Sequence, residues 1–389
     1  MAFDQSSPFT ALGRFRVYYD AIATRPQAAL SGPAPSSSGM MAEAVLASEF
    51  RSDSIFAKLA GYATGGGDNA ALLTEGYAAH HPKPGVRLLA GLKREVWGNG
   101  VAWNPANLLD NELPFDPKTW RSRPLDGIAG RQMLLFGINN ASGEYEMILL
   151  PQLKDPWGHT RAGGELATRI TWLWDATEVN VGLIKTISNA PARMRRSAIS
   201  LWGSRPINDG MTVFGDFAVH FSNPFSYPQT DFAHIATNGR TPVVASLIGA
   251  NLRLPWEMSL RVEAAYNGFG YNRQERIRYL DGLTVSAQRG EIATVQAWAQ
   301  RYQRYLLSRR YVGATLSREG ISSTFDWRLG ILFGMDDRSH SFSGALTYHV
   351  TPRLDLSIEA VYDGGPKPWS ELANQPVARR LMGGLVWHL

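Results

Sequence analysis

The chain has 389 residues, no cysteine and a formal net charge of +5. The absence of cysteine excludes disulfides and thiolate metal sites. No run of about 18 apolar residues occurs, which excludes a transmembrane helix. The 39 Lys and Arg residues are spread over the whole chain, which argues against a nucleic-acid-binding protein. Mean hydropathy is slightly negative, as in soluble proteins, but a membrane β-barrel also has this property because half of each strand faces a polar lumen.

The first strand is predicted at 9–23, where apolar and charged side chains alternate. Phe15 and Val17 lie on one face, and Arg14 and Arg16 lie on the other. A period of two is typical of a strand and not of a helix. One face of this strand is therefore predicted to meet an apolar environment and the other a polar one.

The same alternation continues to the end of the chain. In the segment 354–363, for example, Leu356 and Ile358 alternate with Ser357 and Glu359. Counting such segments gives 18 strands, with 16 as the alternative; bacterial single-chain barrels have an even number. The predicted strands are 9–23, 41–51, 55–64, 70–81, 85–98, 125–138, 143–153, 163–175, 177–188, 196–206, 211–222, 242–254, 258–268, 304–318, 323–334, 339–350, 354–363 and 378–389.

The connections between these strands alternate between short turns and longer loops. The short ones always fall at the same parity, as in an up-and-down barrel whose tight turns are periplasmic and whose long loops are extracellular. A soluble all-β protein has no reason to keep this parity. The short connections are predicted at 52–53, 82–84, 139–142, 175–177, 204–210, 255–257, 319–321 and 351–353.

Two long connections, 99–124 and 269–303, are predicted to fold over or into the lumen. The stretch 85–127 begins as a strand and breaks at Trp97-Gly98-Asn99-Gly100 into a Pro- and Asn-rich loop. In the second loop, the apolar spacing within 290–303 predicts a short amphipathic helix. The constriction is assigned to Trp97, Trp103, Asn104, Asn107, Trp120, Trp298 and Arg301.

The sequence thus predicts one all-β domain over 1–389, a transmembrane up-and-down antiparallel barrel with inward-folded extracellular loops, in the outer membrane of a Gram-negative bacterium. Residues 1–5 lack the basic and apolar regions of a signal peptide, so this prediction requires that a signal peptide has been removed. Outer-membrane lipid and lipopolysaccharide are the expected surroundings. Arginines in the loop 189–196 are candidates to bind anionic solute or lipopolysaccharide phosphates, or they form a solvated basic loop.

The segment 91–100 runs into Trp103-Asn104-Pro105-Ala106-Asn107. With its WG-x-G corner followed by an NP-x-N element, the chain resembles outer-membrane porin-type barrels of the alginate-export-like group. The motif covers about a tenth of the chain. The resemblance implies a passive conduit for a polar or anionic solute. Alginate exporters line the lumen heavily with arginine, whereas the polar faces here are mixed.

The charged face of each strand is taken as lumenal. These side chains either select solutes by charge across the pore or pair across neighbouring strands and hold the wall together. The pore-lining candidates are Arg14, Arg16, Arg87, Lys93, Glu95, Arg169, Arg253, Arg261, Glu263, Arg328, Arg353 and Glu359.

Catalytic and metal-binding motifs are not found in the sequence, so no enzyme activity and no cofactor are predicted. His80, His81, His349 and His388 are interpreted as isolated structural histidines. The expected function is a channel for the uptake or export of small polar or anionic solutes. The alternative is a plugged, non-conducting barrel that serves as a structural partner in an envelope assembly.

Overall fold

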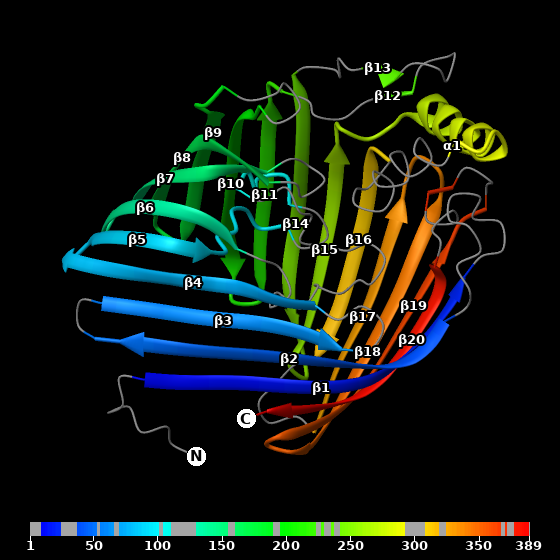
Figure 1. The fold of residues 1–389 in the computed structure, drawn as a ribbon, viewed down its shortest axis with the longest axis horizontal. Helices are drawn as coiled ribbons and strands as arrows, with labels where there is room; N and C mark the ends of the chain where they lie inside the picture. Colours follow the sequence, from blue (N-terminus) through cyan, green and yellow to red (C-terminus); the bar gives the residue numbers. More distant parts are fainter. Residues whose placement is uncertain are drawn as a thin grey trace.

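The computed structural model describes residues 9–24, 37–52, 55–65, 70–100, 104–109, 130–154, 160–189, 195–222, 227–228, 235–236, 242–291, 308–318, 324–366, 370–371 and 377–388. Eighteen antiparallel strands form one sheet in which each strand pairs with the next along the chain (Figure 1). The strands are β1 (Phe9–Thr24), β2 (Ser37–Arg51), β3 (Ile55–Gly65), β4 (Ala70–Lys83), β5 (Val86–Lys93), β6 (Arg131–Asn140), β7 (Gly143–Lys154), β8 (Thr160–Trp174), β9 (Thr177–Thr186), β10 (Ser197–Asn208), β11 (Met211–His220), β14 (Val243–Leu254), β15 (Met258–Asn267), β16 (Arg310–Arg318), β17 (Phe325–Gly334), β18 (Ser339–Thr351), β19 (Leu354–Gly364) and β20 (Val377–His388).

The sheet closes on itself because β1 also pairs with β20. Their register runs from Arg14 opposite His388 to Ile22 opposite Arg380. Closure gives every strand two partners and removes the exposed edges that an open sheet would have. The predicted barrel of 18 strands is confirmed, and the alternative of 16 is excluded.

Short connections join the strands at one end of the barrel. They lie at 84–85, 141–142, 175–176, 209–210 and 352–353. We call this the turn end and the opposite one the loop end. In the turn before β5, Gly85 has φ +80°, and a Cβ there would lie 2.6 Å from the carbonyl oxygen of Asn139. Only glycine satisfies both conditions.

Several predicted strand limits were wrong, and three of them lie beside the long loops. The strand predicted at 85–98 ends at Lys93, because the chain leaves the sheet there and the Arg94 N–H points to the Glu75 carboxylate at 3.4 Å. The next strand begins at Arg131 instead of residue 125, and β16 begins at Arg310 instead of residue 304.

The loop between β15 and β16 contains a helix that the sequence pattern did not predict. Helix α1 (Arg273–Gln288) lies beyond the loop end of the strands (Figure 1). Its first turn is closed by a reciprocal capping box: the Glu275 N–H donates to Asn272 Oδ1 at 2.9 Å, and the Asn272 N–H donates to Glu275 Oε2 at 2.8 Å. The helix predicted at 290–303 lies outside the described residues from 292 onward.

Two further two-residue strands, β12 (Tyr227–Pro228) and β13 (Ile235–Ala236), pair in the loop between β11 and β14. Among the described residues, no helix is long and apolar enough to cross a membrane.

The two faces of the wall differ as the alternation predicts. On β6, Met133 and Leu135 are buried on the inside, whereas Leu134 and Ile138 are 53% and 43% exposed on the outside. The outer face carries large apolar side chains around the barrel, and aromatic ones such as Trp174, 82% exposed, lie near the turns. An apolar exterior with interfacial aromatics is the surface that a lipid bilayer requires.

Candidate functional site

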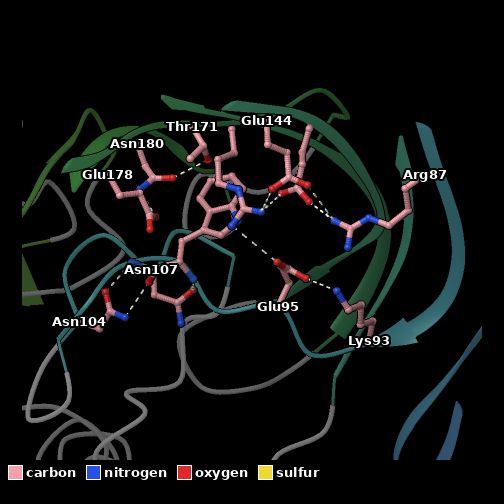
Figure 2. Close-up of polar contacts among 12 residues, drawn as sticks. Arg87, Lys93, Glu95, Asn104, Asn107, Glu144, Thr171, Glu178 and Asn180 are labelled. Atoms are coloured by element: carbon pink, nitrogen blue, oxygen red, sulfur yellow. Dashed lines mark hydrogen bonds and ion pairs between the residues drawn. The ribbon is translucent and has the colours of Figure 1, made fainter. Parts of the chain in front are cut away.

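The candidate site is the inner wall of β5–β9 together with residues 94–100 and 104–109, which pack on it and which we call the inward segment. Arg87 on β5 ion-pairs with Glu146 on β7 and lies 3.5 Å from Glu144 (Figure 2). Arg169 on β8 approaches the same two carboxylates at 2.6 and 3.2 Å. Glu146 has no exposed side-chain surface, so its charge is compensated by two guanidinium groups.

The same network reaches the inward segment through Glu95. The Lys93 ammonium group ion-pairs with Glu95, and Arg169 Nη1 lies 3.8 Å from its other oxygen. Toward β9, Thr171 of β8 donates to Asn180 of β9 at 2.6 Å, and Asn180 donates to Glu178 of the same strand at 2.7 Å. Figure 2 shows Glu178, Asn180, Thr171, Glu144 and Arg87 along the wall, with Glu95 of the inward segment facing them.

Trp97 anchors the inward segment in an apolar cluster. Its side chain is completely buried, and its ring is stacked on Trp202 of β10 with 5.6 Å between centroids. The ring also lies over Gly182 of β9, where a Cβ would come within 2.8 Å of it. The rest of the cluster comes from the segment itself, with Ala106, Leu108 and Leu109, and from the inner faces of β4–β11.

The NP-x-N element gives this segment its shape. Asn104 Nδ2 donates to the Trp97 carbonyl at 2.7 Å, and Asn104 Oδ1 accepts the Asn107 N–H at 3.1 Å. Asn107 Oδ1 lies 3.4 Å from the Trp97 N–H. Both asparagines are buried, so their amides replace the backbone partners that Trp97 lost on leaving the sheet.

Asp216 of β11 holds the corner that follows Trp97. Its carboxylate accepts the N–H groups of Asn99 and Gly100 at 2.9 and 2.8 Å. From β15, Arg261 donates to the Asn99 carbonyl and to Glu263 at 2.6 Å. The segment is thus tied to the inner wall as far round as β15.

A buried triad of charges holds the end of the segment. Arg131 donates to the Leu109 carbonyl at 2.7 Å, and Arg196 donates to the Leu108 carbonyl. Both guanidinium groups pair with Glu165, at 2.7 and 3.5 Å, and its side chain is fully buried. Two arginines, one carboxylate and two backbone carbonyls therefore form one polar unit.

Water reaches a different part of the inner wall. On β17 and β19, Arg328 is exposed and Ser357 and Glu359 are partly exposed, all on the inner face.

Nearer the turn end, His349 bridges two carboxylates, with Nδ1 2.8 Å from Asp355 and Nε2 3.0 Å from Asp326. Within the described part of the chain, no cluster of three or more His, Asp or Glu side chains could hold a metal ion.

A second buried polar cluster lies at the loop end. Arg276 of α1 has no exposed surface, donates to Ser308 and ion-pairs with Asp337 at 3.3 Å. Tyr311 of β16 and the Ser308 N–H both donate to Glu371, which lies between β19 and β20. This cluster fixes the helix to three neighbouring connections.

The remaining predicted residues are distributed as follows. On β1, Arg14 and Phe15 point to opposite faces of the sheet. Arg253 is exposed near the turn end of β14. Arg353 lies in the turn between β18 and β19 and not, as had been predicted, on the wall. Trp103, Trp120, Trp298, Arg301 and the side chain of Arg16 lie outside the described residues.

Sequence reasoning missed several residues of the site. It did not select Arg131 or the Glu144–Glu146 pair. The signal for the pair was present, since both carboxylates occupy the face of β7 opposite Tyr145 and Met147. Arg196, which was assigned to a basic loop, instead pairs with buried Glu165.

No family model and no curated protein matches the chain. Among solved structures, OccAB1 of Acinetobacter baumannii has a TM-score of 0.58 at 11% identity, covering 98% of this chain and 96% of that one. OprD of Pseudomonas aeruginosa has a TM-score of 0.57 at 9% identity, covering 98% and 95%. Wzi of Escherichia coli has a TM-score of 0.55 at 12% identity, covering 96% and 83%, and is described as a carbohydrate-binding outer-membrane β-barrel.

The chain has the fold of outer-membrane porin-type β-barrels. This confirms the predicted fold class and agrees with the apolar exterior of the wall. At 9–12% identity the likeness concerns the fold alone. The narrower resemblance to the alginate-export-like group stays a prediction.

Proposed function

We propose that the protein is a passive channel of the bacterial outer membrane for small polar or anionic solutes, without chemical change of the solute. One observation carries the proposal: the inward segment is fixed to the inner wall between β4 and β15, while Arg328 on β17 and Glu359 on β19 stay accessible to water. A loop held on the wall narrows a lumen without filling it. The barrel size supports this, since about 16–18 strands leave an aqueous channel in porins.

The charged side chains of the inner wall differ in their exposure to water. Around Glu146, the cations of Arg87 and Arg169 are compensated by carboxylates within ion-pair distance. Arg328 and Arg253 are instead exposed. Exposed cations in a narrowed lumen raise the local concentration of anions, so we assign selectivity to these exposed residues and a structural role to the buried ion pairs around Glu146.

A plugged barrel in an envelope assembly is the second candidate. The loop-end part of the inner wall is covered: Leu332 is 1% exposed and Ser341 is completely buried. The similar barrel Wzi is described as involved in capsule assembly. If residues 269–303 close the lumen completely, the protein would bind or support a partner instead of conducting.

Conductance in planar lipid bilayers separates the two candidates. The full chain and a variant lacking residues 269–303 would be reconstituted and recorded side by side in potassium chloride. Channel function predicts discrete openings of the full chain and a larger conductance of the deletion variant. Openings only after the deletion would favour the plugged barrel. No openings from either protein, both folded, would overturn the channel proposal.

Selectivity is tested with two substitutions that remove the same charge. Arg328→Gln changes a lumenal cation, and Arg379→Gln changes one on the outside, where the guanidinium lies 5.6 Å from the Tyr362 ring centroid. The reversal potential in a salt gradient should shift toward cation preference with Arg328→Gln alone. Equal shifts in both variants would remove Arg328 from the selectivity assignment.

A further inference from the structure

The outer wall contains an apolar groove where β9–β11, β14 and β15 run side by side. Its volume is about 830 Å³, within the range of about 300–1,000 Å³ of small-molecule sites. Most of the residues that line it face outward, among them Val262 and Ala264, whereas Glu263 between these two points into the lumen and does not line it. The groove therefore opens to the outside of the barrel, where the bilayer lies.

The floor of the groove is a pair of glycines. Gly203 of β10 and Gly215 of β11 lie directly opposite each other in the strand register. On the two sides of this pair, in the same row, stand Val179 and Ile248, and Ile248 is 68% exposed because it rises beside the missing side chains. Leu201 closes the groove toward the loop end.

A cation stands at the turn end of the same groove. Arg205 is two residues beyond Gly203, on the same outward face, and is exposed. Its neighbour Ser204 is opposite Glu178 of β9, and the next residue of β9, Thr177, lines the same groove and is opposite the exposed Trp174 of β8. Tryptophan side chains of this kind mark the level of the lipid headgroups. Arg205 is thus at the depth of a phosphate, and the groove extends from there toward the membrane centre.

We propose that this groove is a binding site for one phospholipid of the leaflet at the turn end, with an acyl chain over Gly203 and Gly215 and the phosphate on Arg205. Charge and shape both point to this occupant, because arginine pairs well with phosphate and the groove is apolar along its length. A second copy of the barrel fits less well. A two-fold interface would set the same groove against itself and leave a void between the two walls.

Gly215→Leu tests the site by filling it. A Cβ at Gly215 would meet only the Leu247 carbonyl oxygen, at 3.5 Å, which is ordinary van der Waals contact, and the rest of the leucine would extend into the groove. Gly344→Leu is the matched control, because Gly344 lies on the outer face of β18 and its Cβ would meet only Leu329, at 3.6 Å. Arg205→Gln removes the proposed phosphate contact.

Native mass spectrometry of the detergent-purified full chain with added palmitoyl-oleoyl phosphatidylglycerol measures the bound lipid. The wild type and Gly344→Leu should retain one lipid at activation energies that remove the others. Gly215→Leu should lose it, and Arg205→Gln should release it at lower energy.

Retention by Gly215→Leu, or equal loss from Gly344→Leu, would overturn the proposal. A monomer–dimer shift in Gly215→Leu without a change in lipid would assign the groove to a second copy. Because conductance is measured separately, failure here leaves the channel proposal untouched.

Discussion

The indole of Trp97 is stacked on that of Trp202, with 5.6 Å between ring centroids and 20° between ring planes. Trp97 belongs to the inward segment, which begins after the end of β5 at Lys93, and Trp202 lies on the inner face of β10. This contact fixes the inward segment to the wall, and the polar contacts of Asn99 and Leu108 extend the attachment in both directions. The width of the lumen therefore depends on a small number of identifiable side chains.

The first prediction concerns this stack. Trp97→Ala removes a fully buried side chain, which costs about 3–5 kcal/mol in a protein core. Most of this free energy should be lost from attachment of the segment, because the strand hydrogen bonds remain. We expect noisier and larger single-channel currents with little change in the barrel's mobility on a semi-native gel. Trp256→Ala in the exposed turn 255–257 is the control and should leave the currents unchanged.

The second prediction concerns the corner after Trp97. Asp216→Ala leaves the N–H groups of Asn99 and Gly100 without the carboxylate that accepts them. A buried group without a partner costs about 1–3 kcal/mol. Hydrogen exchange at residues 99 and 100 should accelerate, while exchange at the paired strand residues of β11 should not. Uniform acceleration along β11 would instead mean that Asp216 supports the strand itself.

The barrel could be predicted from the sequence because its determinants are local. Alternation along each strand and the parity of the connections report directly on a wall with one apolar and one polar face. The attachment of the inward segment is not local. Trp97 packs on Gly182 and Trp202, and no pattern in a single sequence links residues so far apart along the chain. The NP-x-N motif was recognised as part of the lumen, but its role in holding the Trp97 backbone required the structure.

Helix α1 was not predicted from the sequence, for a different physical reason. Among the described side chains of the helix, the buried ones are Arg276, Tyr279 and Ser286, so polar residues interrupt the apolar stripe by which an amphipathic helix is recognised. The residues Asn272 and Glu275 were the available signal, since their spacing is that of a capping box. A helix that packs through buried polar contacts is found by its cap and not by its periodicity.

The third prediction concerns the shared carboxylate at the end of the inward segment. Glu165→Gln leaves Arg131 and Arg196 without their common negative charge. Breaking a buried ion pair from one side costs about 3–5 kcal/mol, so the urea midpoint of the barrel in detergent should fall clearly. Glu257→Gln is the matched substitution at an exposed pair, where Arg318 is 4.0 Å away. It should change stability by about 1 kcal/mol or less. Equal effects would show that burial does not distinguish the two sites.

The last prediction concerns the contact that fixes helix α1 to the barrel. Arg276 is completely buried and pairs with Asp337 and Ser308. Arg276→Gln shortens the side chain and removes its charge, which leaves Asp337 buried without its cation. The helix should then detach locally while the closed sheet persists, because none of the strand pairs involves α1. Trypsin should cut the variant faster at the remaining arginines of the helix, Arg273 and Arg278, with the barrel fragment staying resistant.

Arg289→Gln, at a side chain that is 69% exposed, removes the same charge and should leave the cleavage rate at those two sites unchanged. If the two variants are cut at the same rate, the buried pair does not hold the helix in place.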